Sequence, residues 1–166
     1  MELSFTKYRI NLKYSFGISR SNNNWYDVAF IFIKDQGIVG RGEAAPSIRY
    51  GESINDIIKI LESKISFPNQ IYDRESLWKH IKPQLRGIKS LEAAFNMAIW
   101  DWWGQKQKKP VYQLLNIDSS RIPKTSFTIA IGKIDEIERK IEESKPYSIL
   151  KVKLGTPKID KDIINE

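Results

Sequence analysis

The first fifty residues alternate between hydrophobic and polar side chains in the manner of β-strands. Residues 2–10 (ELSFTKYRI) alternate with a period of two, so an extended strand here would have one apolar and one polar face. The segments 25–33 and 37–45 flank the sequence KDQG, whose glycine suits a turn position with positive φ. The pattern therefore predicts a three-stranded antiparallel sheet, with a loop over residues 17–24 after the first strand.

The spacing of hydrophobic residues then changes to that of helices. Ser53 and Asp56 form an S-x-x-D capping box ahead of an apolar stripe, which predicts a helix start. A second helix is expected from about Asp73, and a third from about Ser90 to Gln107. A short helix follows at residues 110–115, with proline in its first position.

After Arg121 the pattern becomes that of a βαβ unit. The segments predict a buried strand, an amphipathic helix, a second buried strand and the start of another helix, at residues 125–132, 134–144, 148–155 and 157–166. This order implies a parallel sheet. Two parallel strands cannot cover both of their faces, and a (β/α)₈ barrel needs roughly 250 residues. We therefore expect two domains, at residues 1–120 and 121–166, of which the second is the first part of an incomplete barrel.

Composition limits the function classes. Of 166 residues 27 are basic and 20 acidic, giving a net charge of +7, and cysteine is absent, so disulfides and thiolate metal sites are excluded. The sequence has no signal peptide pattern and no run of about 18 apolar residues, so we expect a cytoplasmic protein that does not enter membranes. The lysines are spread along the chain except for KQKK at 106–109. The sequence contains no aromatic-rich basic motif, so we do not expect nucleic-acid binding.

The segment SILKVKLG contains two lysines two residues apart. On a strand, Lys151 and Lys153 share one face, while Leu150, Val152 and Leu154 form the other. One interpretation is a half-exposed strand with its polar face in solvent, since lysines are usually exposed. The other is a buried pair used in acid–base chemistry, because burial and a neighbouring like charge both favour a neutral lysine. The alternation alone is compatible with both.

Several ordered motifs resemble those of one enzyme family. They are GRGEAAP, YGES, SLEAAFNMAIWDWWGQ, PVYQLL, TSFTIAIG and LKVKLG, at residues 40–46, 50–53, 90–105, 110–115, 125–132 and 150–155. This order resembles the enolase superfamily and its muconate lactonizing enzyme subgroup, most closely the dipeptide epimerases of the L-Ala-D/L-Glu type. The resemblance implies an α+β capping domain followed by the first part of a (β/α)-barrel, in a chain truncated after the second barrel strand.

The resemblance also implies roles for five residues. Lys153 would be the base that removes the α-proton of a dipeptide, and Lys151 would hold charge on the substrate carboxylate and keep the Lys153 pKa low. Arg20 would reach an acidic substrate side chain, although an exposed loop arginine is equally compatible with the sequence. Thr128 would contact the dipeptide or simply pack in the barrel. Tyr50 would lie in a second specificity loop.

The implied cofactor is Mg²⁺, whose carboxylate ligands would lie beyond residue 166, so we assign no metal ligand in this chain. The expected activity is a 1,1-proton transfer through an enediolate on a small-molecule substrate, in a possible homo-oligomer, and the fragment alone is expected to be inactive. Alternatives are a muconate-type cycloisomerase, an o-succinylbenzoate synthase, or a non-enzymatic anion-binding α+β module. The family usually has glycine where this chain has Lys108 and Asn116.

Overall fold

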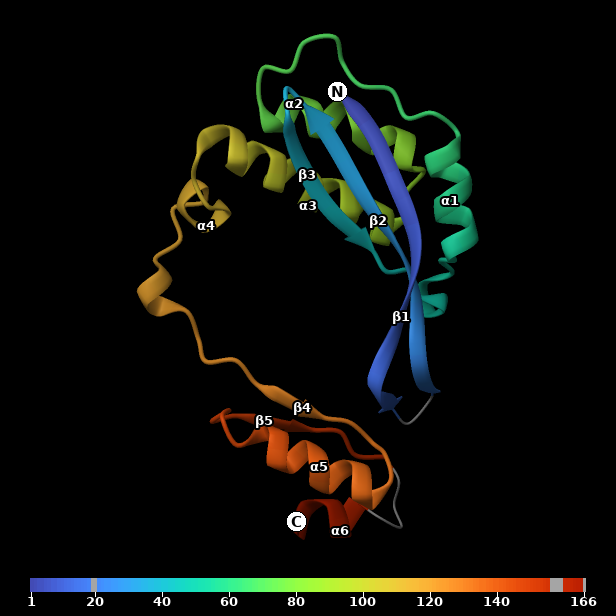
Figure 1. Cartoon of the computed structure of the whole chain (residues 1–166), viewed down its shortest axis with the longest axis vertical. Helices are drawn as coiled ribbons and strands as arrows, with labels where there is room; N and C mark the ends of the chain where they lie inside the picture. The colour runs from blue at the N-terminus through green and yellow to red at the C-terminus, as the bar shows by residue number, and fades with distance from the viewer. Residues whose placement is uncertain (19–20, 156–159, 166) are drawn as a thin grey trace. The chain divides into compact units, whose positions relative to one another are not determined.

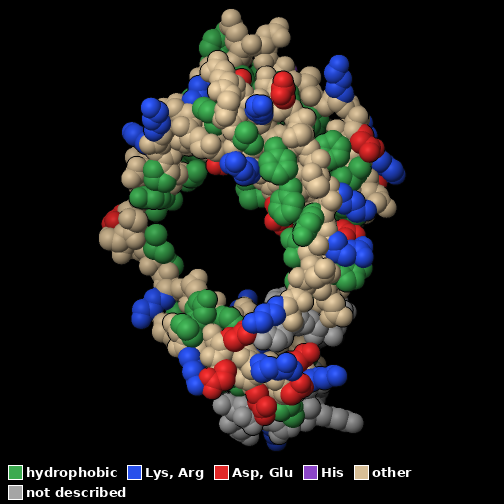
Figure 2. Space-filling view, in the orientation of Figure 1, with side chains coloured by type: hydrophobic (Ala, Val, Ile, Leu, Met, Phe, Trp, Pro, Cys, Tyr) green, Lys and Arg blue, Asp and Glu red, His purple; other side chains and the backbone are tan. Residues whose placement is uncertain are grey.

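The computed structural model describes residues 1–18, 21–155 and 160–165. The chain divides into two compact units (Figure 1). The first unit consists of Met1–Ile10 and Asp27–Ser119, and the second of Asn11–Tyr26 and Ser120–Glu166. No helix within the described ranges is both long and apolar enough to cross a membrane. On the face shown in Figure 2, basic and acidic side chains are interspersed, so the excess of basic residues is not gathered into one field there.

The predicted three-stranded antiparallel sheet is confirmed. Its strands lie in the order β1 (Glu2–Ile18), β2 (Ser21–Asp35) and β3 (Ile38–Ala44). The turn between β2 and β3 has positive φ at Gln36 (49°) and Gly37 (81°), as the KDQG sequence predicts for its glycine. The predicted loop over 17–24 is wrong in extent, because β1 continues to Ile18 and β2 begins at Ser21. Strand conformation can extend through a polar sequence of low strand propensity, because pairing and packing outweigh that propensity.

Helices cover one side of this sheet (Figure 1). They are α1 (Ile54–Glu62), α2 (Arg74–Ile81) and α3 (Lys89–Gln107). The short α4 (Val111–Leu114) packs against α3. The 3₁₀ turns are η1 (Ile48–Tyr50), η2 (Lys82–Leu85) and η3 (Ser119–Arg121). The predicted starts of the first two helices are confirmed by their caps. The Ser53 hydroxyl accepts from the Asp56 N–H at 3.2 Å, and the Asp73 carboxylate accepts from the Ser76 N–H at 2.7 Å.

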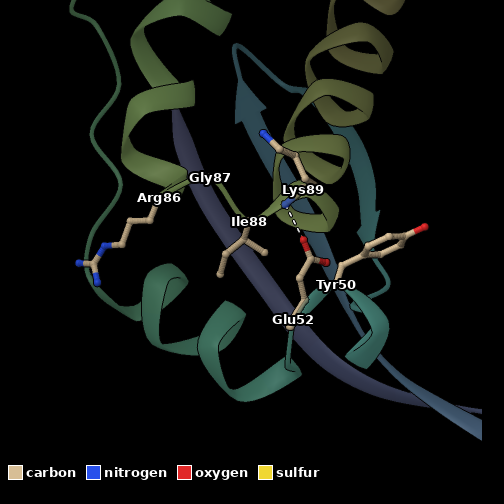
Figure 3. A pocket seen from close by; sticks show the side chains of 7 residues that line it. Tyr50, Glu52, Arg86, Gly87, Ile88 and Lys89 are labelled. Carbon is tan, nitrogen blue, oxygen red and sulfur yellow. Dashed lines mark hydrogen bonds between the residues drawn. The ribbon is translucent and has the colours of Figure 1, made fainter.

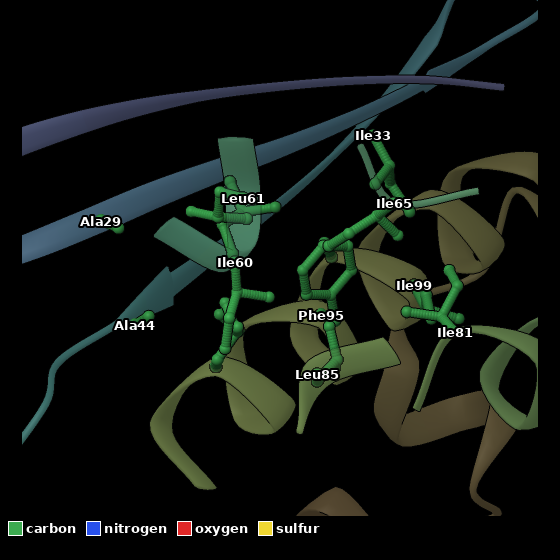
Figure 4. Packing of buried hydrophobic residues seen from close by; sticks show 14 of the residues in the cluster. Ala29, Ile33, Ala44, Ile60, Leu61, Ile65, Ile81, Leu85, Phe95 and Ile99 are labelled. Atoms are coloured by element: carbon green, nitrogen blue, oxygen red, sulfur yellow. The ribbon is translucent and has the colours of Figure 1, made fainter. Parts of the chain in front are cut away.

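The core of the first unit lies between the sheet and these helices (Figure 4). Ile33 of β2, Ile81 of α2, and Phe95 and Ile99 of α3 are all fully buried. Each such side chain contributes about 1.5–3 kcal/mol relative to an exposed position. The buried residues of α3 therefore form the face that holds this helix against the sheet.

Two glycines of β3 let α3 approach the sheet closely. A methyl group built on Gly42 would overlap the carbonyl group of Ala94, and one built on Gly40 would overlap the carbonyl of Ala98 and lie 2.7 Å from the Trp102 Cβ. Ala94 and Ala98 are both completely buried. The GRG sequence is therefore a packing requirement, because only glycine leaves room for the helix backbone.

Helix α3 ends at Lys108 in a left-handed conformation, with φ 54° and ψ 37°. The Lys108 N–H donates to the Gln105 carbonyl at 3.1 Å, and the Lys109 N–H donates to the Gly104 carbonyl at 3.0 Å. Glycine is the usual residue at such a helix end, since a Cβ atom strains the left-handed region. Lysine therefore carries a conformational cost here, as the sequence predicts.

We expect Lys108→Gly to stabilise the first unit by about 1 kcal/mol, because glycine removes that strain. Urea unfolding followed by tryptophan fluorescence measures the change in free energy. Lys109→Gly is the matched control, since Lys109 is an exposed neighbour outside the left-handed region. An equal gain from both variants would show that the left-handed backbone is not the cause.

The second unit contains a two-stranded parallel sheet. Its elements are β4 (Phe127–Ile129), α5 (Ile134–Ser144), β5 (Leu150–Val152) and α6 (Asp160–Asn165). The predicted strand–helix–strand–helix order is confirmed, and the strands pair in parallel. The prediction that 148–155 is a buried strand is wrong, because Leu150 and Val152 are 45% and 41% exposed. Among the residues that the structure describes, no strand pairs with the other edge of β5.

Candidate functional site

The parallel register of β4 and β5 brings three predicted site residues together. Thr128 pairs with Lys151, and Ile129 pairs with Val152. The Lys153 N–H donates to the Ile129 carbonyl at 2.9 Å, which continues the ladder by one step. Because paired residues point to the same face and the faces alternate, Thr128, Lys151 and Lys153 share one face.

Helix α5 covers the opposite face of these strands. Ile129 is buried against Ile137 of α5, and the partly buried Phe127 and Ile141 pack around this pair. Through the register, Leu150 and Val152 lie on the side of Phe127 and Ile129. The lysine pair therefore lies on the face turned away from the helix.

The two lysines differ in their surroundings. Lys151 is exposed, whereas Lys153 is half-buried. Burial lowers the pKa of Lys153 below its usual value, and the positive charge of Lys151 lowers this pKa further. A lysine with a lowered pKa has a larger neutral fraction, and only the neutral amine can accept a proton. This face therefore offers one candidate base beside a second lysine.

Tyr50 belongs to the first unit and is described there by itself. Tyr50 ends η1 in the first unit and is 74% exposed, with the Arg49 guanidinium 6.0 Å from its ring centre. Arg20 lies outside the described residues. The structure thus brings together Thr128, Lys151 and Lys153, while Tyr50 is described only within its own unit.

Tyr50 lines an open pocket of about 390 Å³ in the first unit (Figure 3). Glu52, Arg86 and Lys89 contribute the charged groups of its wall. The Glu52 carboxylate accepts from the backbone N–H groups of Lys89 at 2.6 Å and Ser90 at 3.3 Å. Helix α3 has Ile88 at its N-cap position and no side-chain cap of its own, so Glu52 supplies this cap from a distant segment.

The sequence did not predict the capping role of Glu52. The only sign of it was that an apolar residue, Ile88, stands at the N-cap position of α3 and cannot cap the helix itself. Burial raises the pKa of the Glu52 carboxyl, but hydrogen bonds from Ser90 and from backbone N–H groups outweigh this effect, and the pKa lies below its ordinary value of 4.5. The carboxylate form is therefore the one that the native state prefers.

This preference predicts a pH dependence of stability. Because the native pKa is lowered, Glu52 stabilises the first unit above pH 4.5, and this contribution is lost as the pH falls through the lower native pKa. Glu52→Gln should reduce the free energy of unfolding by about 1 kcal/mol at neutral pH, with a smaller difference in acid. Urea titrations at several pH values measure this, with Glu62→Gln, an exposed position on α1, as control. A pH-independent difference would contradict the assignment.

The described residues do not form a candidate metal site. Within residues 1–18, 21–155 and 160–165 no group of three or more His, Asp or Glu side chains could hold a metal ion. The face with Lys151 and Lys153 carries ammonium groups instead of the oxygen ligands that Mg²⁺ prefers. An Mg²⁺ ion at this face would need ligands from outside the described residues.

Comparison with known proteins gives a consistent family assignment. Residues 2–116 match the family model described as mandelate racemase / muconate lactonizing enzyme, N-terminal domain. An L-Ala-D/L-amino acid epimerase of Flavobacterium johnsoniae is 32% identical over 171 aligned positions, which cover 100% of this chain and 49% of that enzyme. The chain therefore spans about half the length of this curated relative.

Solved structures confirm the predicted fold class. A dipeptide epimerase of Methylococcus capsulatus, complexed with Mg and the dipeptide L-Arg-D-Lys, matches 99% of this chain and 48% of its own with a TM-score of 0.82 and 21% identity. A muconate lactonizing enzyme of Mycobacterium smegmatis, complexed with muconolactone, matches 98% of this chain and 47% of its own with a TM-score of 0.78 and 20% identity. At these identities the likeness establishes a shared fold.

Proposed function

The chain belongs to the mandelate racemase/muconate lactonizing enzyme family, and on this premise we propose that it is the N-terminal part of an Mg²⁺-dependent dipeptide epimerase. The observation that carries the proposal is the half-buried Lys153 beside Lys151 and Thr128, on the strand face away from α5. The reaction would be a 1,1-proton transfer at the α-carbon of a dipeptide.

Each residue of this face has a chemical task in the proposed reaction. Neutral Lys153 takes the α-proton of one epimer, and the planar intermediate is then protonated on its opposite face by a second acid; in the reverse direction protonated Lys153 delivers the proton. Lysine bases of this kind are the known pattern of the enolase superfamily. Lys151 stabilises the negative charge that develops on the substrate carboxylate. The Thr128 hydroxyl can donate a hydrogen bond to the dipeptide.

A bound Mg²⁺ would stabilise an enediolate as a Lewis acid. The described residues offer no ligands for it, so the roles above are assigned to side chains of this chain only. A complete site would need further βα units to supply the ligands and a base for the opposite face of the α-carbon. Assembly as a homo-oligomer and a cytoplasmic location remain predictions from the sequence.

The two alternatives differ in what supports them. A cycloisomerase or o-succinylbenzoate synthase is compatible with the fold, since a muconate lactonizing enzyme has nearly the same TM-score as a dipeptide epimerase. The relative that matches the whole chain at 32% identity is an epimerase, which favours the first proposal. A non-enzymatic anion-binding module is compatible with two neighbouring lysines, but the family match over residues 2–116 favours the enzyme.

Hydrogen exchange in D₂O tests the proposal directly. We would join residues 1–166 to the C-terminal half of the Flavobacterium johnsoniae relative and incubate the chimera with Mg²⁺ and L-Ala-L-Glu or L-Ala-D-Glu. Proton NMR should show loss of the glutamate α-proton signal and formation of the other epimer. The 166-residue chain alone should show neither. Exchange absent from a folded chimera with several dipeptides would count against epimerase function, and turnover by the chain alone would contradict the need for further units.

Arg20 gives a separate prediction about specificity. If its guanidinium pairs with an acidic substrate side chain, Arg20→Met in the chimera should raise KM for acidic dipeptides much more than for neutral ones. Loss of a charged hydrogen bond costs roughly 1.5–3 kcal/mol, which corresponds to about 10- to 150-fold. Steady-state kinetics with L-Ala-L-Glu and a neutral dipeptide measure the ratio. An equal effect on both substrates would assign Arg20 to structure.

A further inference from the structure

Ala130 is the neighbour of Lys153 across the parallel ladder. The Lys153 N–H bond to the Ile129 carbonyl, at 2.9 Å, follows the Ile129–Val152 pair and places Lys153 opposite Ala130. By alternation, Ala130 and Lys153 share the face turned away from α5. Ala130 is only 2% exposed, so its small side chain is covered although this sheet has just two strands.

The two lysines of this face differ in the residue beside them. Lys151 has the half-buried Thr128 as its neighbour and is itself exposed. Lys153 has an alanine beside it and is half-buried. Lysine side chains commonly lay their aliphatic stem along apolar surface and keep the ammonium group near water. A methyl side chain leaves the surface of β4 open to such a stem, whereas a larger side chain would occupy that space.

We propose that Ala130 is a positioning residue for Lys153, because its small side chain lets the lysine stem lie along β4 instead of extending into solvent. The arrangement lays the stem on the strand and so half-buries the side chain, and burial is the main cause of the lowered Lys153 pKa. The value of this arrangement for catalysis rests on the proposed function, in which Lys153 is the base. The positioning itself does not, and it can be measured on the present chain.

The experiment is a size series at position 130 in the 166-residue chain. Ala130→Gly, Ala130→Val and Ala130→Leu are titrated with the original protein, and the Lys153 side chain is followed by NMR of ¹³C-labelled lysine. The Lys153 pKa should rise from glycine and alanine to valine and leucine. In the Ala130→Leu variant the neutral fraction at about pH 8 should fall roughly threefold or more, since a one-unit rise gives tenfold. A general loss of packing would not make the pKa of this one lysine rise in step with the size of the side chain at position 130.

Thr128→Leu is the matched control, because it adds apolar volume on the same face beside Lys151. It should change the Lys153 titration less than Ala130→Leu does. If amide NMR shows that Ala130→Leu does not fold, the valine and glycine variants decide the question. A Lys153 pKa that stays constant or falls along the series would overturn the positioning role. That outcome would not affect the proposed function, which is tested separately by α-proton exchange in the chimera. If instead the pKa follows the size series but the chimera shows no exchange, the proposed function is wrong and the positioning role stands.

Discussion

Lys153→Ala in the chimera is expected to abolish α-proton exchange for one dipeptide epimer and to spare the other. Lys153 lies on the strand face away from α5, and in the proposed reaction it would approach the substrate carbon from one side only. Loss of a positioned base costs about 10²–10⁴-fold in rate. The opposite epimer would be deprotonated by a base outside this chain, so its exchange should survive. NMR of both epimers in D₂O measures the two rates separately.

Lys151→Ala is the matched variant for this experiment. In the proposed reaction it would remove a charge that acts on the substrate carboxylate in both directions, so both epimers should slow together. It also removes the like charge that helps to lower the Lys153 pKa, so the rate that depends on Lys153 should shift to higher pH. Equal losses for both epimers in Lys153→Ala would contradict a one-sided base and reduce Lys153 to a second electrostatic residue.

Gly42→Ala is expected to destabilise the first unit by about 3 kcal/mol or more. The added methyl group would overlap the Ala94 carbonyl oxygen and lie 2.8 Å from its carbonyl carbon. Overpacking of a core usually costs 1–3 kcal/mol, and the neighbour here is helix backbone that cannot rotate away. Domains of this kind have a total stability of about 5–15 kcal/mol, so a large share would be lost. Urea unfolding measures the difference.

Two further variants identify the cause of this loss. Ala94→Gly combined with Gly42→Ala should not restore stability, because the overlap involves the Ala94 carbonyl rather than its methyl group. Glu43→Ala changes the next residue of β3, whose side chain points to the other face, and should cost about 1 kcal/mol or less. Restoration in the double variant would show that the helix can move and that the close approach is not required.

The sequence by itself determined the features that depend on short-range chemistry. The caps at Ser53 and Asp73, the turn at Gly37 and the extent of α3 follow from residues within a few positions of one another. The shared face of Lys151 and Lys153 follows from the period of two of any strand. These predictions succeed because backbone geometry repeats locally, whatever the rest of the chain does.

Only the tertiary structure decided which segments meet. It supplied the Glu52 cap of α3 from 37 residues away, the approach of α3 to Gly40 and Gly42, and the alignment of Thr128 with Lys151. It also showed that Leu150 is exposed where the sequence predicts burial. An apolar face indicates that a strand can be buried, but the segments that would bury it lie far away in the sequence. Register, caps between segments and burial therefore depend on long-range packing that a local pattern does not contain.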